Sequence, residues 1–214
     1  MNYILLSVIG AAIILDKFAF GEFGISQPII AGTIIGALFG DIQSGIFIGA
    51  ILQLIFLIGL PIGKDIPPDG QAAGVIGTGS YFLLRTMNQP DQALCLAFIL
   101  ALISAIIGGA MEIIARRRNE KLYHLFMRKG KHLYLYHLFG FIPAFLKNFI
   151  LIFPIFLLAN YLKIPQQFPE LSRELLMIIG LSVGFANAIY LFSKKTTVIY
   201  VILGALCGLA LLVF

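Results

Sequence analysis

The run of residues 28–62 most constrains the fold, because it is almost entirely apolar and fits no simple number of membrane spans. Its 35 residues would extend about 52 Å as one straight helix. One span needs about 20 residues, and two spans need about 40 plus a turn. A short arm from Ile29 to Gly40, a break at Gly40–Asp41 and a longer arm from Ile42 to Leu60 would fit this length. The run therefore predicts a broken or re-entrant helix, which is tolerated only where protein or a watery cavity surrounds it.

The next apolar segment, residues 72–86, is also too short and too rich in glycine for a comfortable lipid-facing span. Short, interrupted helices of this kind usually mark the binding site of a transporter. Residues 28–86 are therefore the candidate substrate region.

The rest of the chain predicts an all-α protein that crosses the membrane several times. Hydrophobic residues make up 60% of its 214 residues and charged residues only 12%, against about 45–50% and 25% in soluble domains. We expect one membrane-embedded domain over residues 1–214. The N-terminal run lacks a basic flank and a cleavage pattern, which favours a retained helix over a signal peptide. Besides 28–62, the apolar runs lie at 2–15, 72–86, 92–115, 138–160, 173–192 and 197–214.

Clusters of basic residues predict which helix ends face the cytoplasm. Seven of the fifteen lysines and arginines lie within residues 116–131, directly after the cleanest span, Asp91–Ala115. Next to an apolar helix, such a cluster indicates the cytoplasmic side rather than a nucleic-acid site. We therefore expect residues 116–137 to form a basic cytoplasmic connector. The later spans then cross alternately, and Lys194 and Lys195 fall on the same side.

Small residues recur every four positions on both arms of the predicted broken helix. Residues at this spacing share one helical face, and small side chains there let another backbone approach closely. We interpret the glycines as packing or hinge positions. The series on the second arm begins with Asp41 and ends with Gln53, and packing alone does not require such hydrogen-bonding side chains. The first series is Gly32, Gly36 and Gly40, and the second is Asp41, Gly45, Gly49 and Gln53.

Asp41 and Gln53 are the first candidates for substrate contact. A carboxylate at membrane depth costs at least a few kcal/mol, which makes Asp41 a functional-site hypothesis. Asp41 can equally cap the helix that begins at Ile42, and the two roles are compatible. Gln53 precedes an apolar run and has no local capping role, which favours a polar lining.

Four further polar residues are weaker candidates for the substrate site. Gln27 stands just before the short arm, and Asp69 and Gln71 follow the Pro67–Pro68 pair. The loop that contains them is either a surface turn or folds inward as part of the site. Asn187, in a late apolar run, is typical of a hydrogen bond between helices.

The sequence predicts no catalytic residue, metal site or cofactor. We interpret the histidines as solvated residues of the polar connector loop, without a carboxylate partner, and the cysteines as core residues without a disulfide. Asp16 and Lys17 are interpreted as the solvated end of the first helix. The histidines and cysteines are His124, His132, His137, Cys95 and Cys207.

An ordered series of short motifs resembles a known membrane family. The chain reads LDKFAF from residue 15, PIIAG from 28, GDIQSGIFIG from 40 and LQLIFLIG from 52, followed by PIG and PPD. This series resembles the membrane subunit IIC of the mannose–fructose–sorbose family of the bacterial sugar phosphotransferase system. The resemblance is strong over residues 15–77 and looser at GLSVGFANAIY, which begins at residue 180.

The resemblance implies a multi-pass, sugar-translocating subunit of the bacterial inner membrane, without catalytic residues of its own. It also implies a IID membrane partner, cytoplasmic IIA and IIB proteins that pass phosphate from phosphoenolpyruvate to the sugar, and an oligomer of IIC–IID pairs. A substrate-holding core is expected to move against a scaffold. The chain is shorter than is usual for the family and departs from it at Gln53, where many members carry Glu. An amide can still donate to and accept from a sugar hydroxyl.

From the residues and the resemblance together, we expect a hexose of mannose, fructose or sorbose type to contact Asp41 and Gln53, with Asp69 and Gln71 folded in. A non-transporting structural or assembly subunit is the alternative. An intramembrane aspartyl protease would also use Asp41. However, residues 38–41 lack the first glycine of a G-x-G-D motif, and no second aspartate motif is present to share a proton.

Overall fold

The computed structural model describes residues 2–19, 21–57, 68–129, 133–192, 199–200 and 202–204. Within these ranges the regular structure is entirely helical, which confirms the predicted all-α class. Most of the predicted last span, 197–214, lies outside the described residues. The named helices are α1 (Tyr3–Ile14), α2 (Asp16–Ala19), α3 (Pro28–Leu38), α4 (Ile42–Ile55), α5 (Gly70–Leu84), α6 (Pro90–Lys129), α7 (Leu133–Tyr161) and α8 (Arg173–Phe192).

Three of the described helices are long and apolar enough to cross a membrane. They contain the segments Pro90–Arg128, Leu138–Tyr161 and Arg173–Leu191, in agreement with the apolar runs of the sequence. α1, α3 and α4 are apolar but shorter. The prediction of a polytopic helical membrane protein with interrupted helices is therefore confirmed.

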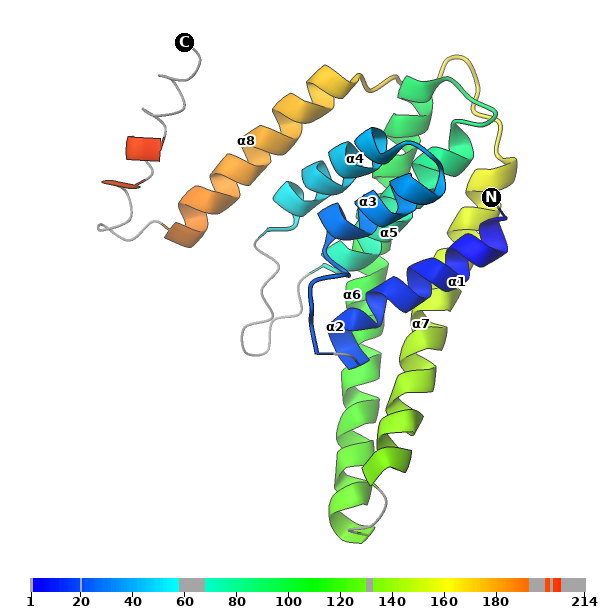
Figure 1. The fold of residues 1–214 in the computed structure, drawn as a ribbon, viewed down its shortest axis with the longest axis vertical. Helices are drawn as coiled ribbons and strands as arrows, with labels where there is room; N and C mark the ends of the chain where they lie inside the picture. Colours follow the sequence, from blue (N-terminus) through cyan, green and yellow to red (C-terminus); the bar gives the residue numbers. More distant parts are fainter. Residues whose placement is uncertain are drawn as a thin grey trace.

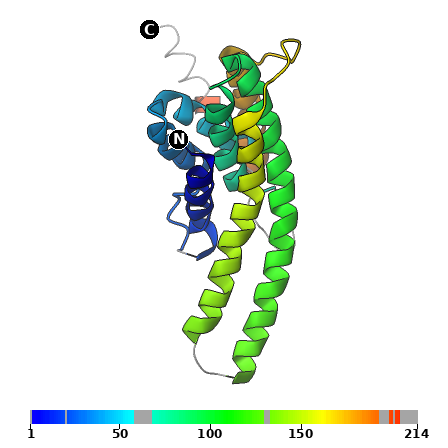
Figure 2. The ribbon, with the colours of Figure 1, turned by 90° about the vertical axis from the view of Figure 1, so that its right-hand side faces the viewer.

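The basic connector is helical rather than a loop. α6 continues through Arg116, Arg117 and Arg118 to Lys129, and α7 begins at Leu133. Its 40 residues extend about 60 Å, twice the hydrocarbon thickness of a bilayer. Arg, Lys and Glu are good helix formers, so the charges do not end the helix. Figure 1 and Figure 2 show α6 and α7 running side by side beyond the other helices.

One histidine of the connector lies on a helix and has a carboxylate neighbour. His124 lies on α6, with Nε2 4.0 Å from Oε1 of Glu120, so the expectations of a loop position and of no carboxylate partner are wrong. Both side chains are exposed, and such a pair stabilises the helix only slightly. His132 and the side chain of His137 lie outside the described residues.

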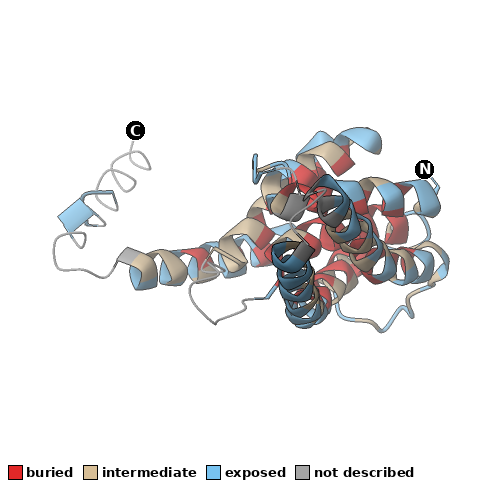
Figure 3. Cartoon of the chain, turned by 90° about the horizontal axis from the view of Figure 1, so that it is seen from below, coloured by how far each residue is buried: buried red, intermediate tan, exposed pale blue. Residues whose placement is uncertain are grey.

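α5 is the centre of the fold. Every residue of this helix except Gln71 is buried, and it packs against α1, α3, α4, α6 and α7. Its many glycine and alanine residues allow these neighbours to approach closely. Figure 3 shows the buried residues gathered in the helix cluster, whereas α8 extends away from it. The expectation that this segment does not face lipid is confirmed for residues 72–84.

The predicted break in the long apolar run is present. α3 ends at Leu38, α4 begins at Ile42, and Gly40 adopts φ +73°, a left-handed conformation that glycine tolerates at little cost. The two helices fold back on each other as a hairpin (Figure 1). α4 ends at Ile55 rather than at Leu60, and residues 58–67 lie outside the described ranges.

The glycines of the hairpin lie where the two backbones meet. A Cβ atom added at Gly45 would lie 2.7 Å from the Cα of Gly36 and would also collide with the carbonyl oxygen of Gly32. A Cβ atom at Gly49 would lie 2.9 Å from the Cα of Ile29. Because these atoms belong to the backbone, no side-chain rotation can relieve the contact. The hairpin is therefore closed by direct backbone packing.

We predict that Gly45→Ala lowers the free energy of unfolding by about 1–3 kcal/mol or more, the cost typical of overpacking. The reason is that the hairpin must open to admit the methyl group. The measurement is the melting temperature of the detergent-solubilised protein. Gly40→Asn is the control, since a Cβ at Gly40 meets nothing within 4 Å and Asn tolerates positive φ. A wild-type melting temperature for Gly45→Ala would contradict the close approach.

Candidate functional site

A small polar cavity lies where α3 begins, α4 ends and α5 begins. Its volume is about 50 Å³, which is room for a few water molecules. The cavity is therefore too small for a hexose in this conformation. Its lining residues are Gln27, Pro28, Gln53, Phe56, Pro68, Gly70 and Gln71.

The cavity brings together three of the residues predicted from the sequence: Gln27, Gln53 and Gln71. The Oε1 atom of Gln53 is buried, and no donor in the described part of the chain reaches it. A buried acceptor without a partner costs about 1–3 kcal/mol. One residue of the lining therefore carries a buried acceptor without a partner, which a water molecule or a ligand hydroxyl would satisfy once it is exposed.

Gln27 lies at the cavity because it directly precedes α3, and its side chain makes no capping hydrogen bond there. Gln27 is the N-cap residue of α3, but its amide makes no capping hydrogen bond. Pro28 occupies the first turn, where its missing N–H costs nothing. The preceding turn is held by Asp16, whose carboxylate accepts hydrogen bonds from the backbone N–H groups of Phe23 and Gly24 at 3.0 Å each.

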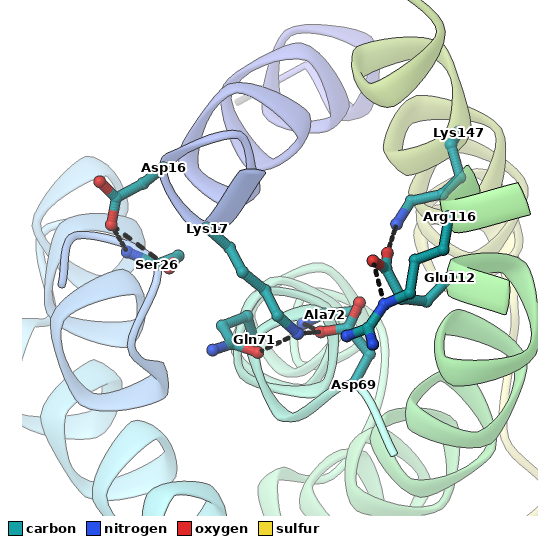
Figure 4. Close-up of polar contacts among 9 residues, drawn as sticks. All are labelled: Asp16, Lys17, Ser26, Asp69, Gln71, Ala72, Glu112, Arg116 and Lys147. Carbon is teal, nitrogen blue, oxygen red and sulfur yellow. Dashed lines mark hydrogen bonds and ion pairs between the residues drawn. The ribbon is translucent and has the colours of Figure 1, made fainter. Parts of the chain in front are cut away.

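Asp16 and Lys17 are not the solvated end of a helix, so that expectation is wrong. Asp16 is 3% exposed and also accepts from the backbone N–H of Ser26 at 3.2 Å. Lys17 reaches across to the start of α5 (Figure 4). Asp16 contacts the turn that follows its own helix, and Lys17 contacts residues more than 50 positions away, which helical periodicity does not reveal.

Asp69 lies next to the cavity but does not line it. Its Oδ1 atom caps α5 by accepting from the backbone N–H of Ala72 at 3.3 Å, and it lies 3.3 Å from Nζ of Lys17. The backbone N–H of Asp69 donates to the carbonyl oxygen of Ala105 in α6 at 2.8 Å. The loop thus folds inward at this point, as one of the two alternatives held, with its carboxylate occupied by protein partners.

Asp41 lies at the other end of α4. Twelve residues separate it from Gln53, which is about 18 Å along the helix. A hexose is much shorter, so one sugar cannot contact both residues in this conformation. Oδ1 of Asp41 accepts from the backbone N–H of Ser44 at 3.0 Å, which confirms its capping role. Oδ2 accepts from Nη1 of Arg85 at 2.6 Å.

Two arginines that were not among the predicted site residues lie beside Asp41 and Ser44. Arg85 follows α5 and lies over the ring of Phe82, 4.6 Å from its centroid. Arg173, at the start of α8, donates to Oγ of Ser44 at 2.6 Å. The cluster therefore joins the tip of the hairpin to α5 and α8. A lone Arg at the end of an apolar run was the available signal for Arg85.

Asn187 hydrogen-bonds α8 to the end of α4. Its Nδ2 atom donates to the carbonyl oxygens of Leu54 at 2.9 Å and Ile55 at 3.1 Å. These carbonyls lie at the C-terminal end of α4, where no further helical N–H can satisfy them. Asn187 thus attaches α8 close to Gln53 without lining the cavity.

A further buried ion pair connects the two longest helices. Nζ of Lys147 in α7 lies 2.9 Å from Oε2 of Glu112 in α6, and Nε of Arg116 lies 3.3 Å from Oε1 of the same carboxylate (Figure 4). This pair lies outside the cavity. It stabilises the association of α6 and α7 where they leave the helix cluster.

We predict that Asp41→Ala destabilises the protein more than Asp41→Asn does, by about 1 kcal/mol, because asparagine retains the N-cap acceptor and alanine does not. Both variants lose the ion pair with Arg85, so the comparison isolates the cap. Thermal unfolding of the purified protein measures the difference. Equal melting temperatures for the two variants would contradict the capping role.

Comparison with known proteins agrees with this architecture. A family model described as the PTS system sorbose-specific IIC component matches residues 1–212. The mannose-specific EIIC component of Escherichia coli strain K12 is 32% identical over 122 residues, which are 57% of this chain and 42% of that protein. The sorbose-specific EIIC component of Lacticaseibacillus casei is 32% identical over 125 residues, 58% of this chain and 41% of that protein. The matches span less than half the length of these curated relatives.

Two solved structures share the fold. One, described as a membrane protein, has a TM-score of 0.69 at 24% identity and covers 96% of this chain and 85% of its own. The other, the mannose transporter ManYZ in complex with microcin E492, has a TM-score of 0.53 at 23% identity. Its match covers 96% of this chain and 84% of that chain. Because the family model covers nearly the whole sequence, the chain belongs to the family of sorbose-specific IIC components of the sugar phosphotransferase system.

Proposed function

We propose that the chain is the sugar-translocating IIC subunit of a phosphotransferase complex in the bacterial inner membrane, and that it passes a hexose of mannose, fructose or sorbose type inward. The observation that carries the proposal is the cavity at the open end of the α3–α4 hairpin. Three glutamine side chains line it, and one of them holds a buried acceptor without a partner. Sugar hydroxyls both donate and accept, as amides do.

In this proposal the structure corresponds to a closed, sugar-free conformation. The cavity volume of about 50 Å³ must increase before a hexose enters. α3 and α4 are joined by backbone contacts, so the hairpin moves as one unit relative to α5. Such a movement would separate Gln27 and Gln53 on the hairpin from Gln71 on α5 and make room between them.

The proposal includes the partners that the family resemblance implies. A IID subunit would complete the membrane complex as IIC–IID pairs, and cytoplasmic IIA and IIB proteins would supply the phosphoryl group. The whole chain would form one membrane-embedded domain with residues 28–86 as its substrate region. The basic end of α6 and the adjacent start of α7 would then face the cytoplasm. Reading frames for IID, IIA and IIB beside this gene would support the assignment.

We predict that Gln53→Ala and Gln71→Ala each raise the apparent KM for sugar uptake, by roughly two- to tenfold for the loss of one hydrogen bond. Uptake of labelled mannose, fructose and sorbose is measured separately in cells that produce the chain with its IID, IIA and IIB partners. Gln167→Ala is the matched control, since Gln167 is an exposed glutamine between α7 and α8.

The controls distinguish transport from assembly. Each variant is checked for membrane abundance and for co-purification with IID, so that a folding defect is not mistaken for lost binding. Unchanged KM values in both variants would remove these glutamines from the site. Absence of sugar uptake with an intact complex would favour a structural or assembly subunit.

A further inference from the structure

A lysine that does not line the cavity contacts the amide oxygen of Gln71, a residue that does. Nζ of Lys17 lies 2.9 Å from Oε1 of Gln71 and 3.3 Å from Oδ1 of Asp69. The side chain of Lys17 is 18% exposed and that of Asp69 is 3% exposed. The ammonium group is therefore held between α2 and the first turn of α5 with little access to water (Figure 4).

The chemistry of an ammonium group determines how the amide of Gln71 is turned. A lysine ammonium has three donors and no acceptor, so it can hydrogen-bond to the amide oxygen but not to the NH₂ group. The oxygen of Gln71 must face Lys17, and the nitrogen must point away. Figure 4 shows this arrangement, with the amide nitrogen on the side opposite to Lys17. Gln71 is also the one residue of α5 that is not buried.

We propose that Lys17 is a positioning residue that fixes Gln71 as a hydrogen-bond donor in the sugar cavity. The inference rests on the proposed function of that cavity. Without Lys17 the amide can rotate by half a turn and present its oxygen instead. With Lys17 in place, Gln71 offers its NH₂ group as a donor, and the opening of the cavity would expose the acceptor Oε1 of Gln53, which is buried and unpartnered in this conformation. A hydroxyl placed between them can accept from the first and donate to the second.

The neighbouring residue ties the opposite wall to the same short helix. Asp16 holds the turn that precedes Gln27 through hydrogen bonds to Phe23, Gly24 and Ser26. Consecutive residues of α2 therefore hold both walls, Asp16 the segment before α3 and Lys17 the start of α5. The position of Lys17 is fixed by this backbone and by its ion pair with Asp69.

A purely structural role for Lys17 makes a different prediction. Lys17 would then only neutralise the buried carboxylate of Asp69, and removing both charges together would restore normal behaviour. The double variant Lys17→Met, Asp69→Asn tests this, because Asn still caps α5 and both charges of the Lys17–Asp69 pair are removed together. If Lys17 positions Gln71, the double variant has nearly the stability of the wild type but still binds the sugar more weakly.

The experiment measures uptake of labelled mannose, fructose and sorbose by cells that produce the chain with its partner subunits. We expect the double variant to have a near-normal melting temperature and membrane abundance but a roughly two- to tenfold higher KM, the effect of one hydrogen bond. Lys17→Arg should keep a low KM, because a guanidinium also only donates. In a Gln71→Ala background, Lys17→Met, Asp69→Asn should raise KM no further.

Each outcome decides between the hypotheses. A wild-type KM in the stable double variant would overturn the positioning role and leave the proposed function intact. A further increase in KM in the Gln71→Ala background would show that Lys17 acts through another group, which also overturns it. If the wild-type complex takes up none of the three sugars, the proposed function fails, and the role of Lys17 at a sugar cavity falls with it.

Discussion

The direct backbone contact between α3 and α4 decides where the polar groups of this protein meet. Without side chains between them, Gly32, Gly36 and Gly45 let the two helices return along each other from the turn at Gly40. Gln27 lies 13 residues before that glycine and Gln53 lies 13 residues after it. A closely packed hairpin folded at this point must bring the two glutamines to the same end. The cavity is thus a consequence of the position of the turn.

The turn was predictable, because residues 28–62 are too long for one span and too short for two. The burial of α5 also followed from its length and its small residues. The partners of the charged groups were not predictable. Arg85 pairs with Asp41 across 44 residues, and Lys17 with Asp69 across 52. Periodicity describes one helix face at a time and contains no information on which other helix covers it.

The helix end at Ala115 shows a different failure. The cluster at Arg116–Arg118 indicates where the apolar surface ends, which the sequence analysis also took as the end of the helix. Charged residues continue a helix readily, so the membrane boundary and the helix boundary are separate properties. The separation of Asp41 from Gln53 has a related reason. Residues on one helical face share a direction, but 12 residues along α4 they are far apart.

Three ion pairs, buried or partly buried, connect different helices of this protein. Lys17–Asp69 joins α2 to α5, Asp41–Arg85 joins the hairpin tip to the end of α5, and Glu112–Lys147 joins α6 to α7. A charge in a weakly polar environment strongly favours a partner, so each pair specifies one arrangement of its helices. None of these three pairs lines the cavity, whose polar side chains are the neutral amides of Gln27, Gln53 and Gln71.

The length of α6 has a mechanical consequence. The same helix accepts the backbone hydrogen bond of Asp69 at Ala105 and continues to Lys129. These 24 residues form a stiff lever of about 36 Å, and a tilt of about 10° at Ala105 would displace its far end by about 6 Å. A small tilt of α6 where it contacts the start of α5 would therefore be a large movement at the tip of the α6–α7 pair.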